Sequence, residues 1–167
     1  MIELVQALTR IKNTGFSPAH VLDIGAYEGE WAKAASVIFE GCSVLMLEAQ
    51  QRTEARLAGL KAFAADRFDY RIVLLGAENK ASVPFFQMDT SVGSTGSSLY
   101  EENTDFPRSV VELPMVRLDD LVAQVGAGPF GVVKLDVQGA ELDVLRGGPQ
   151  TLAAAQFVVL EVSTLPY

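Results

Sequence analysis

The chain has 167 residues, 49% of them hydrophobic, which is enough material for one domain with a sizeable core. Its formal net charge of −8 would repel the backbone of DNA or RNA, so nucleic acid is not an expected partner. A single cysteine and a single histidine exclude an internal disulfide and the usual Cys/His zinc site, and a cytoplasmic location is the default expectation.

Residues 1–19 are predicted to form an N-terminal helix and a loop. Leu4, Val5, Leu8 and Ile11 recur on one face of an amphipathic helix, and we expect that face to pack against the sheet. The segment lacks the charged start, long apolar middle and cleavage site of a signal peptide. The longest apolar runs in the chain have strand length and are too short to cross a bilayer, so no membrane partner is expected.

The next segment, VLDIGAYEGEW over residues 21–31, is the most informative part of the chain. An apolar strand over 20–25 leads into a tight turn from Gly25 to Gly29, and a helix is predicted over about 29–40. This succession is how an α/β sheet binds a nucleoside-bearing cofactor at the ends of its strands.

The same segment indicates which cofactor to expect. A dehydrogenase fingerprint uses three glycines to close on a pyrophosphate, and only two of them have counterparts here. Glu28 and Glu30 stand at the start of the helix, where their carboxylates would repel a phosphate. The pattern therefore favours a phosphate-free, positively charged adenosine compound.

Strands and helices continue to alternate along the rest of the chain. The strands are continuously apolar, as a sheet covered by helices on both faces requires, so we predict an α/β fold with a doubly wound, mostly parallel sheet. The predicted elements are a strand over 43–48, a helix over about 51–65, a strand over 70–75, two shorter strands interrupted by prolines over 81–87 and 110–118, a helix over 118–124, and parallel strands over 130–137 and 157–162.

Between these elements, residues 88–109 are polar, rich in Gly, Ser and Thr, and without periodicity. Loops of this length inside a compact domain are usually functional or disordered. We predict either a lid over the cofactor or acceptor, or a mobile linker.

Two motifs carry a resemblance to a known family. The segment VLDIGAYEGEW resembles the cofactor-binding motif of class I methyltransferases, and KLDVQGAE followed by LDVLRGG over 134–148 resembles the FkbM family of O-methyltransferases. The similarity spans roughly residues 21–163. It implies a Rossmann-like methyltransferase domain that uses S-adenosylmethionine and methylates a hydroxyl of a small acceptor such as a sugar or a polyketide-like natural product.

The resembled fold normally adds a helix and two strands after the fifth strand, whereas this sequence stops at Tyr167. An uncovered strand edge invites association with other chains. We expect either that residues beyond Tyr167 complete the sheet or that a partner covers the edge, and a homodimer is one such arrangement.

The candidate cofactor ligands follow the ends of the first three strands. The first strand and its turn supply an acid and three small residues, although any tight turn needs glycines and the acid could simply accept N–H bonds from the turn. The resemblance implies that the acid ending the second strand binds both ribose hydroxyls and that the turn after the third strand contacts the adenine. Both could instead be ordinary surface positions. The predicted ligands are Asp23, Gly25, Ala26, Gly29, Glu48, Gln50, Gly76, Ala77 and Asp136.

Asp136 ends the fourth strand, and the resemblance places it beside the transferred methyl group. We predict that its carboxylate accepts or orients the proton of the acceptor hydroxyl, with Glu161, at the end of the fifth strand, as second choice. Glu141 lies in the same region or serves the helix dipole. Lys134 is more simply explained by a salt bridge to a neighbouring acid. No ligand spacing supports a metal.

Four further residues are better explained structurally. Asp119 and Asp120 match the family pattern but suit the start of a helix. Trp31 suits packing between the first helix and the sheet. His20 begins the first strand, away from the cofactor crevice, which disfavours a Ser/His/Asp triad.

Two other functions stay open. A module that binds the cofactor without turnover is the main alternative, and an NAD-dependent oxidoreductase is a remote one.

Overall fold

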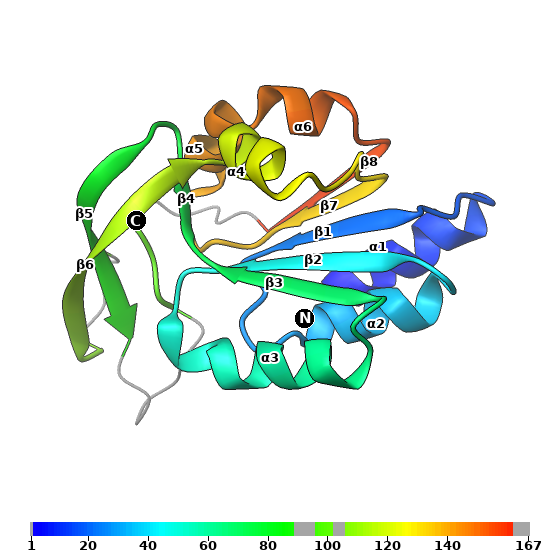
Figure 1. Cartoon of the computed structure of the whole chain (residues 1–167), viewed down its shortest axis with the longest axis horizontal. Coiled ribbons are helices and arrows are strands. Elements are labelled where there is room, and N and C mark those ends of the chain that lie inside the picture. The colour runs from blue at the N-terminus through cyan, green and yellow to red at the C-terminus, as the bar shows by residue number, and fades with distance from the viewer. Residues whose placement is uncertain (1, 89–95, 102–105, 162–167) are drawn as a thin grey trace.

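The structure is a computed structural model that describes residues 2–88, 96–101 and 106–161. A five-stranded parallel sheet forms its centre, in the order β3-β2-β1-β7-β8 (Figure 1). Its strands are β1 (His20–Ile24), β2 (Ser43–Glu48), β3 (Phe68–Ile72), β7 (Val132–Leu135) and β8 (Phe157–Leu160).

Helices cover both faces of this sheet, as the continuously apolar strands predict (Figure 1). One face carries α1 (Ile2–Asn13), α2 (Glu30–Ile38) and α3 (Glu54–Phe63), the last preceded by the 3-10 helix η1 (Gln51–Thr53). The other face carries α4 (Leu118–Val125), α5 (Glu141–Gly147) and α6 (Pro149–Ala153). The predicted doubly wound fold is confirmed.

Alternate residues of each central strand belong to two separate hydrophobic cores. Val21 and Met46 pack beneath the α1–α3 layer, whereas Leu22 and Leu47 pack beneath the α4–α6 layer. The amphipathic face predicted near the N-terminus contributes Leu4, Leu8 and Ile11 to the first core, where α1 contacts α2 and β8. Among the described residues, no helix has both the length and the apolar character needed to span a membrane.

A second sheet stands beside the first and was not predicted as such. Its order is β4-β6-β5, built from β4 (Leu74–Gly76), β5 (Lys80–Met88) and β6 (Arg108–Arg117). The predicted single strand over 70–75 is therefore wrong. After Ile72 pairs with the last residue of β2, the chain leaves the main sheet at Val73, and β4 pairs with β6 instead.

The prediction of short strands interrupted by prolines is also wrong, because β5 and β6 run through Pro84 and Pro114. Pro84 lies on β5, an edge strand, where a missing N–H group costs no ladder bond if it faces outward. The register of β5 shifts between Lys80 and Val83, opposite Pro114, so this second proline faces a bulge.

Candidate functional site

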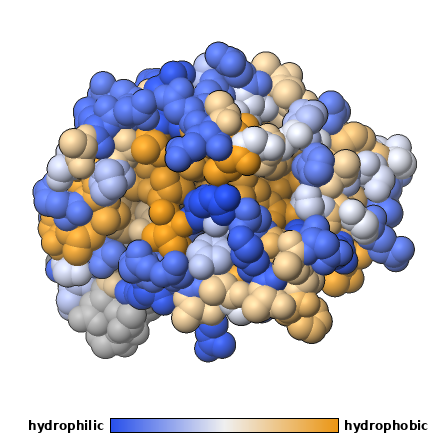
Figure 2. Space-filling view, viewed as in Figure 1, coloured by the Kyte–Doolittle hydropathy of each residue, from blue (hydrophilic) through white to orange (hydrophobic). Residues whose placement is uncertain are grey.

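A cavity opens at the carboxyl ends of β1, β2 and β7, on the side where the second sheet stands. This is where ligands bind in open α/β sheets. Hydrophobic surface extends around the second sheet and is bordered by hydrophilic residues (Figure 2). The lining combines polar groups from the strand ends with an apolar wall made by Val73, Leu74, Leu75, Phe85 and Leu99.

The turn after β1 needs its first glycine because a neighbouring strand end lies against it. Gly25 has φ +75°, and a Cβ atom there would lie 1.8 Å from the carbonyl oxygen of Asp136. The amides of Gly25 and Ala26 donate to the carbonyl of Leu47 at 2.9 and 3.1 Å, which ties the turn to β2. Gly25 and Ala26 line the cavity, as predicted for residues that let a ligand approach the backbone.

Gly29 lies elsewhere. It has φ +82°, and a Cβ there would lie 2.3 Å from a methyl of Leu60 on α3. It is not among the residues that line the cavity. Its small size therefore serves the packing of α2 against α3, and the sequence could not separate this role from cofactor contact.

Glu48 combines burial with an orientation toward the cavity. Its side chain is buried at the end of β2 and lines the cavity. One carboxylate oxygen accepts the backbone N–H of Tyr27 at 2.7 Å, and the other accepts that of Gln50 at 2.9 Å. Burial raises the pKa of Glu48 above its ordinary value, and these two N–H donors oppose the increase. Each oxygen keeps a lone pair for a ligand hydroxyl.

Gln50 is buried beside Glu48 and also lines the cavity. Its side-chain oxygen accepts the hydroxyl of Ser97 at 3.0 Å and a contact from the Arg52 guanidinium. Ser97 lies in the segment predicted as a lid or linker, and it also accepts the amide of Met88 at 3.1 Å. Residues 96–101 of that segment are described, whereas 89–95 and 102–105 lie outside the described residues.

Asp23, predicted to bind the cofactor directly or through a water, is fully buried and does not line the cavity. Asp23 lies two residues after Val21 in β1, so its side chain faces the α1–α3 layer. There the Lys134 ammonium lies 3.0 Å from its carboxylate. Lys134 also donates to the carbonyl of Gly25 at 2.7 Å and lies 3.6 Å from Asp136. Burial lowers the pKa of Lys134, but the negative charges of Asp23 and Asp136 outweigh this effect and hold the pKa above its ordinary value. Direct contact between Asp23 and a cofactor is not supported, while the predicted salt bridge of Lys134 is confirmed.

Asp136 lines the cavity with 20% of its side chain exposed. One of its oxygens accepts the side-chain amide of Gln138 at 2.7 Å. Glu141 lies behind this turn and accepts the amides of Val137 at 2.9 Å and Gly139 at 3.0 Å. Glu141 is thus a structural acceptor for the turn and does not line the cavity.

Besides Asp23 and Gly29, three more predicted site residues lie outside the cavity lining. Glu161 follows β8 on the same rim but is exposed, and partial burial together with the charge of Asp136 raises the pKa of Glu161. Gly76 ends β4, where a Cβ would meet the sulfur of Met115 at 2.2 Å, and Ala77 follows it. The predicted contact of Gly76 and Ala77 with adenine assumed a third strand that stays in the main sheet.

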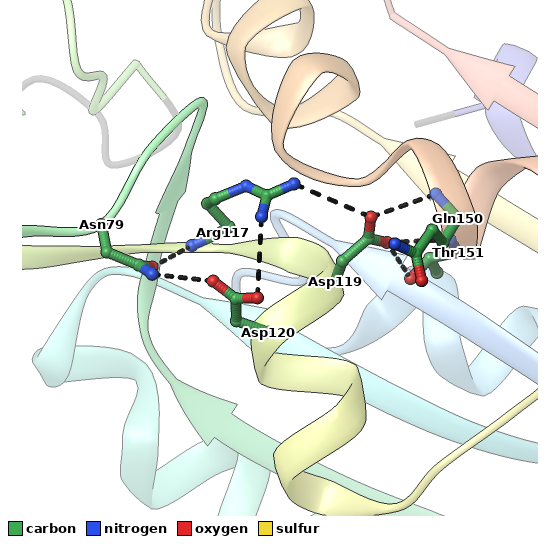
Figure 3. Close-up of polar contacts among 6 residues, drawn as sticks. All are labelled: Asn79, Arg117, Asp119, Asp120, Gln150 and Thr151. Carbon is green, nitrogen blue, oxygen red and sulfur yellow. Dashed lines mark hydrogen bonds and ion pairs between the residues drawn. The ribbon is translucent and has the colours of Figure 1, made fainter.

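Asp119 and Asp120 have structural partners, as predicted, but not through capping of their own helix (Figure 3). Asp119 accepts the amides of Gln150 at 3.1 Å and Thr151 at 2.8 Å, and so caps α6 instead. Asp120 accepts the side-chain amide of Asn79 at 2.7 Å, and Arg117 lies near both acids. The cluster ties the second sheet to the α4–α6 layer.

The remaining sequence predictions concern residues near the ends of α2 and β1. Trp31 is buried between α2 and the sheet, lines the cavity, and lies under the Lys134 ammonium at 6.0 Å. Glu28 and Glu30 are not part of the lining. His20 lies at the opposite end of β1, where its ring contacts the Ser43 hydroxyl at 2.7 Å.

Sequence reasoning missed two residues with unusual backbone geometry. Tyr27 and Gln138, at φ +50° and +55°, are the non-glycine residues with positive φ in the described part of the chain, and both line the cavity. Such conformations cost about 1–3 kcal/mol each and cluster at functional sites. No sequence pattern predicts these conformations, although Tyr27 lies within the predicted turn from Gly25 to Gly29 and Gln138 directly precedes Gly139.

The comparisons with known proteins agree with this geometry. The model of the Methyltransferase FkbM domain matches residues 23–167. The 2-O-methyltransferase NoeI of Sinorhizobium fredii (strain NBRC 101917 / NGR234) is 43% identical over 47 residues, which are 28% of this chain and 19% of that protein. The crystal structure of Methyltransferase FkbM from Methylobacillus flagellatus KT superposes with a TM-score of 0.58 at 15% identity, covering 85% of this chain and 32% of that one. The chain thus spans less than a third of the length of either protein, and the structural match shows the shared fold.

Proposed function

The chain belongs to the FkbM methyltransferase family, and on that premise we propose that it is an S-adenosylmethionine-dependent O-methyltransferase acting on a hydroxyl of a small molecule. The observation that carries the proposal is Glu48, a buried carboxylate held by two backbone N–H groups at the end of β2 and facing the cavity. An acid in this position suits the two hydroxyls of a ribose.

The rest of the lining fits an adenosine compound. The apolar wall of residues 73–75, Phe85 and Leu99 suits a flat heterocycle next to Glu48. Asp136 and the Gly25 turn lie at the β1 and β7 ends, where the methionine portion would be held. A carboxylate there favours the positive charge of that portion.

The same lining argues against a pyrophosphate cofactor. Among the described residues of the cavity, Lys134 is the one cation, and it already contacts Asp23, Asp136 and the Gly25 carbonyl. A pyrophosphate would also face the Asp136 carboxylate, and the turn after β1 lacks the third glycine of the dehydrogenase fingerprint. NAD is therefore a poor fit.

In the proposed reaction, S-adenosylmethionine supplies an activated methyl group on a sulfonium. The protein then has to align the acceptor and exclude water. The Asp136 carboxylate, which is partly exposed in the cavity, accepts a hydrogen bond from the acceptor hydroxyl and orients its proton. The apolar wall limits access of water to the same space. Glu161, exposed outside the lining, is a weaker candidate for this role.

The acceptor class rests on relatives. NoeI is named a 2-O-methyltransferase, and small hydroxylated acceptors such as sugars are the proposed class. No group of three or more potential ligand side chains suited to a metal occurs among the described residues, so no metal enters the proposal.

A ligand-dependent melting experiment tests the cofactor. S-adenosylhomocysteine at about 100 times its Kd should add roughly 2.7 kcal/mol of stability, or about 5–10 °C in Tm for a domain of this size. NAD at the same concentration should leave Tm unchanged. Stabilisation by NAD alone would refute the proposal.

The alternative of a binding module without turnover needs a second assay. Labelled S-adenosylmethionine is incubated with a panel of glycosides and phenols, and methyl incorporation is followed. Binding of S-adenosylhomocysteine with no transfer to any acceptor would favour the passive module.

A further inference from the structure

Gln138 occupies a backbone conformation that suits glycine better than glutamine. Its φ is +55°, in the left-handed region, and it lines the cavity. Glycine adopts this conformation without a steric penalty, whereas a side chain makes it unfavourable. A glutamine here therefore needs a compensating contact, either from its side chain or from the surrounding structure.

The surrounding structure holds the backbone of Gln138 from three directions. The Ser98 hydroxyl donates to the Gln138 carbonyl at 2.6 Å. The Glu141 carboxylate accepts the amides on either side, from Val137 at 2.9 Å and Gly139 at 3.0 Å. Because Ser98 comes from the segment after β5 and Glu141 from α5, two separate elements fix this turn.

With its backbone fixed, Gln138 aims its side chain at Asp136. The amide nitrogen donates to one carboxylate oxygen at 2.7 Å, while the Lys134 ammonium lies 3.6 Å from the other oxygen. Without the amide, the carboxylate would be free to rotate toward Lys134 and close that ion pair. In the closed ion pair, the ammonium would occupy the carboxylate oxygen that an acceptor hydroxyl needs.

We infer that Gln138 is a positioning residue, which holds the Asp136 carboxylate toward the acceptor hydroxyl and keeps it from closing on Lys134. The inference rests on the proposed function, because it assigns Gln138 to the residue proposed to orient the acceptor. Gln138 itself does not have to touch the acceptor. Asp136 keeps its charge near the methionine portion in either orientation, so the effect of Gln138 should appear in turnover and not in cofactor affinity.

Two substitutions separate the amide from the backbone strain. Gln138→Met removes the donor but keeps a long side chain in the left-handed conformation. Gln138→Gly removes the donor and also relieves the conformation. Gln124→Met, at an exposed position of α4, is the matched control.

The assay is methyl transfer from labelled S-adenosylmethionine to para-nitrophenyl glycosides with a free 2-hydroxyl, together with calorimetric binding of S-adenosylhomocysteine. Loss of a hydrogen bond to a charged group corresponds to a fall of roughly 10- to 100-fold, expected here in kcat of both Gln138 variants. The Kd for S-adenosylhomocysteine should stay within about threefold of wild type. Gln138→Gly should melt at or above the wild-type Tm, and Gln124→Met should match wild type throughout.

A double-mutant cycle of Gln138 and Asp136 tests whether Gln138 acts through Asp136. In an Asp136→Ala background, Gln138→Met should change kcat by less than about twofold, because the residue it positions is gone. The inference is overturned if Gln138→Met lowers kcat by the same factor in the Asp136→Ala background as in the wild-type protein. It is also overturned if both single Gln138 variants keep kcat within about twofold of wild type, or if their affinity for S-adenosylhomocysteine falls by the same factor as kcat. A wild-type protein that neither binds S-adenosylhomocysteine nor transfers methyl would instead overturn the proposed function, and the inference with it.

Discussion

Substitution of Glu48 should weaken cofactor binding strongly, because its carboxylate is both buried and already oriented. The side chain is 5% exposed, and its two oxygens accept N–H groups from Tyr27 and Gln50. A hydrogen bond to a charged group contributes about 1.5–3 kcal/mol. Glu48→Ala should therefore raise the Kd for S-adenosylhomocysteine by roughly 10- to 100-fold.

The pH dependence of binding and of stability should have opposite signs at Glu48. Burial raises the pKa of Glu48 above 4.5, so the folded protein holds this proton more tightly than the unfolded chain does. Its contribution to the free energy of unfolding is then fully present below pH 4.5 and is lost as the pH rises through the folded pKa. Ligand binding needs the ionised acceptor, so the Kd should rise as the pH falls through that same value.

Titration calorimetry with S-adenosylhomocysteine at several pH values, combined with thermal melts of the unliganded protein, measures both effects. Glu48→Gln should remove both contributions of this group, and Glu40→Gln, at an exposed position after α2, controls for the change in net charge. The reasoning is refuted if Glu48→Ala binds within about threefold of wild type. It is also refuted if Glu48→Gln keeps the wild-type rise of Kd in acid.

Two further substitutions have matched controls. Gly25→Ala should lower the free energy of unfolding by about 2–5 kcal/mol, since its Cβ would overlap the Asp136 carbonyl as well as strain the backbone. Gly41→Ala, with φ +83° and nothing within 4 Å of the added atom, should cost only about 1–2 kcal/mol in urea denaturation, and equal losses would contradict the overlap. Asp119→Ala should lower the free energy of unfolding by about 2–4 kcal/mol, because it leaves the α6 amides without their acceptor. The control Asp120→Ala should lower it by less than about 1 kcal/mol, because the Asp120 side chain is 49% exposed. Although partial burial would raise the pKa of Asp119, the hydrogen bonds from Thr151 and Gln150 hold it below 3.8. The contribution of Asp119 to the free energy of unfolding is therefore present above pH 3.8 and is lost as the pH falls through the folded pKa. An Asp119→Ala protein whose stability falls in acid as that of wild type does would contradict this.

The sequence predicted the part of the site that depends on strand ends. Apolar runs located β1 and β2 within a residue of their observed ends, and an acid at the last residue of β2 had to reach the rim shared by parallel strands. Glu48 lies there, and the cavity contains it. The position of Asp136 after β7 followed from the same rule.

The sequence failed where side-chain direction or strand pairing mattered. Asp23 comes one residue before the end of β1 and points toward the α1–α3 layer, so it forms an ion pair with Lys134 on the neighbouring strand β7. Gly76 belongs to a strand that pairs with β6 in a different sheet. Neither outcome could be predicted from residue types within the motif, because each depends on a partner more than thirty residues away.

The amino-acid sequence by itself indicated the family, through the resemblance of two motifs. It also determined the sheet and the rim on which the acids gather, since hydrophobic periodicity and strand-to-helix turns are local properties of the chain. Only the tertiary structure decided which acids face the cavity and which are used in packing. That division depends on contacts such as Ser98 with Gln138 and Asp119 with α6, which join segments that are distant along the chain and meet only once the layers have packed.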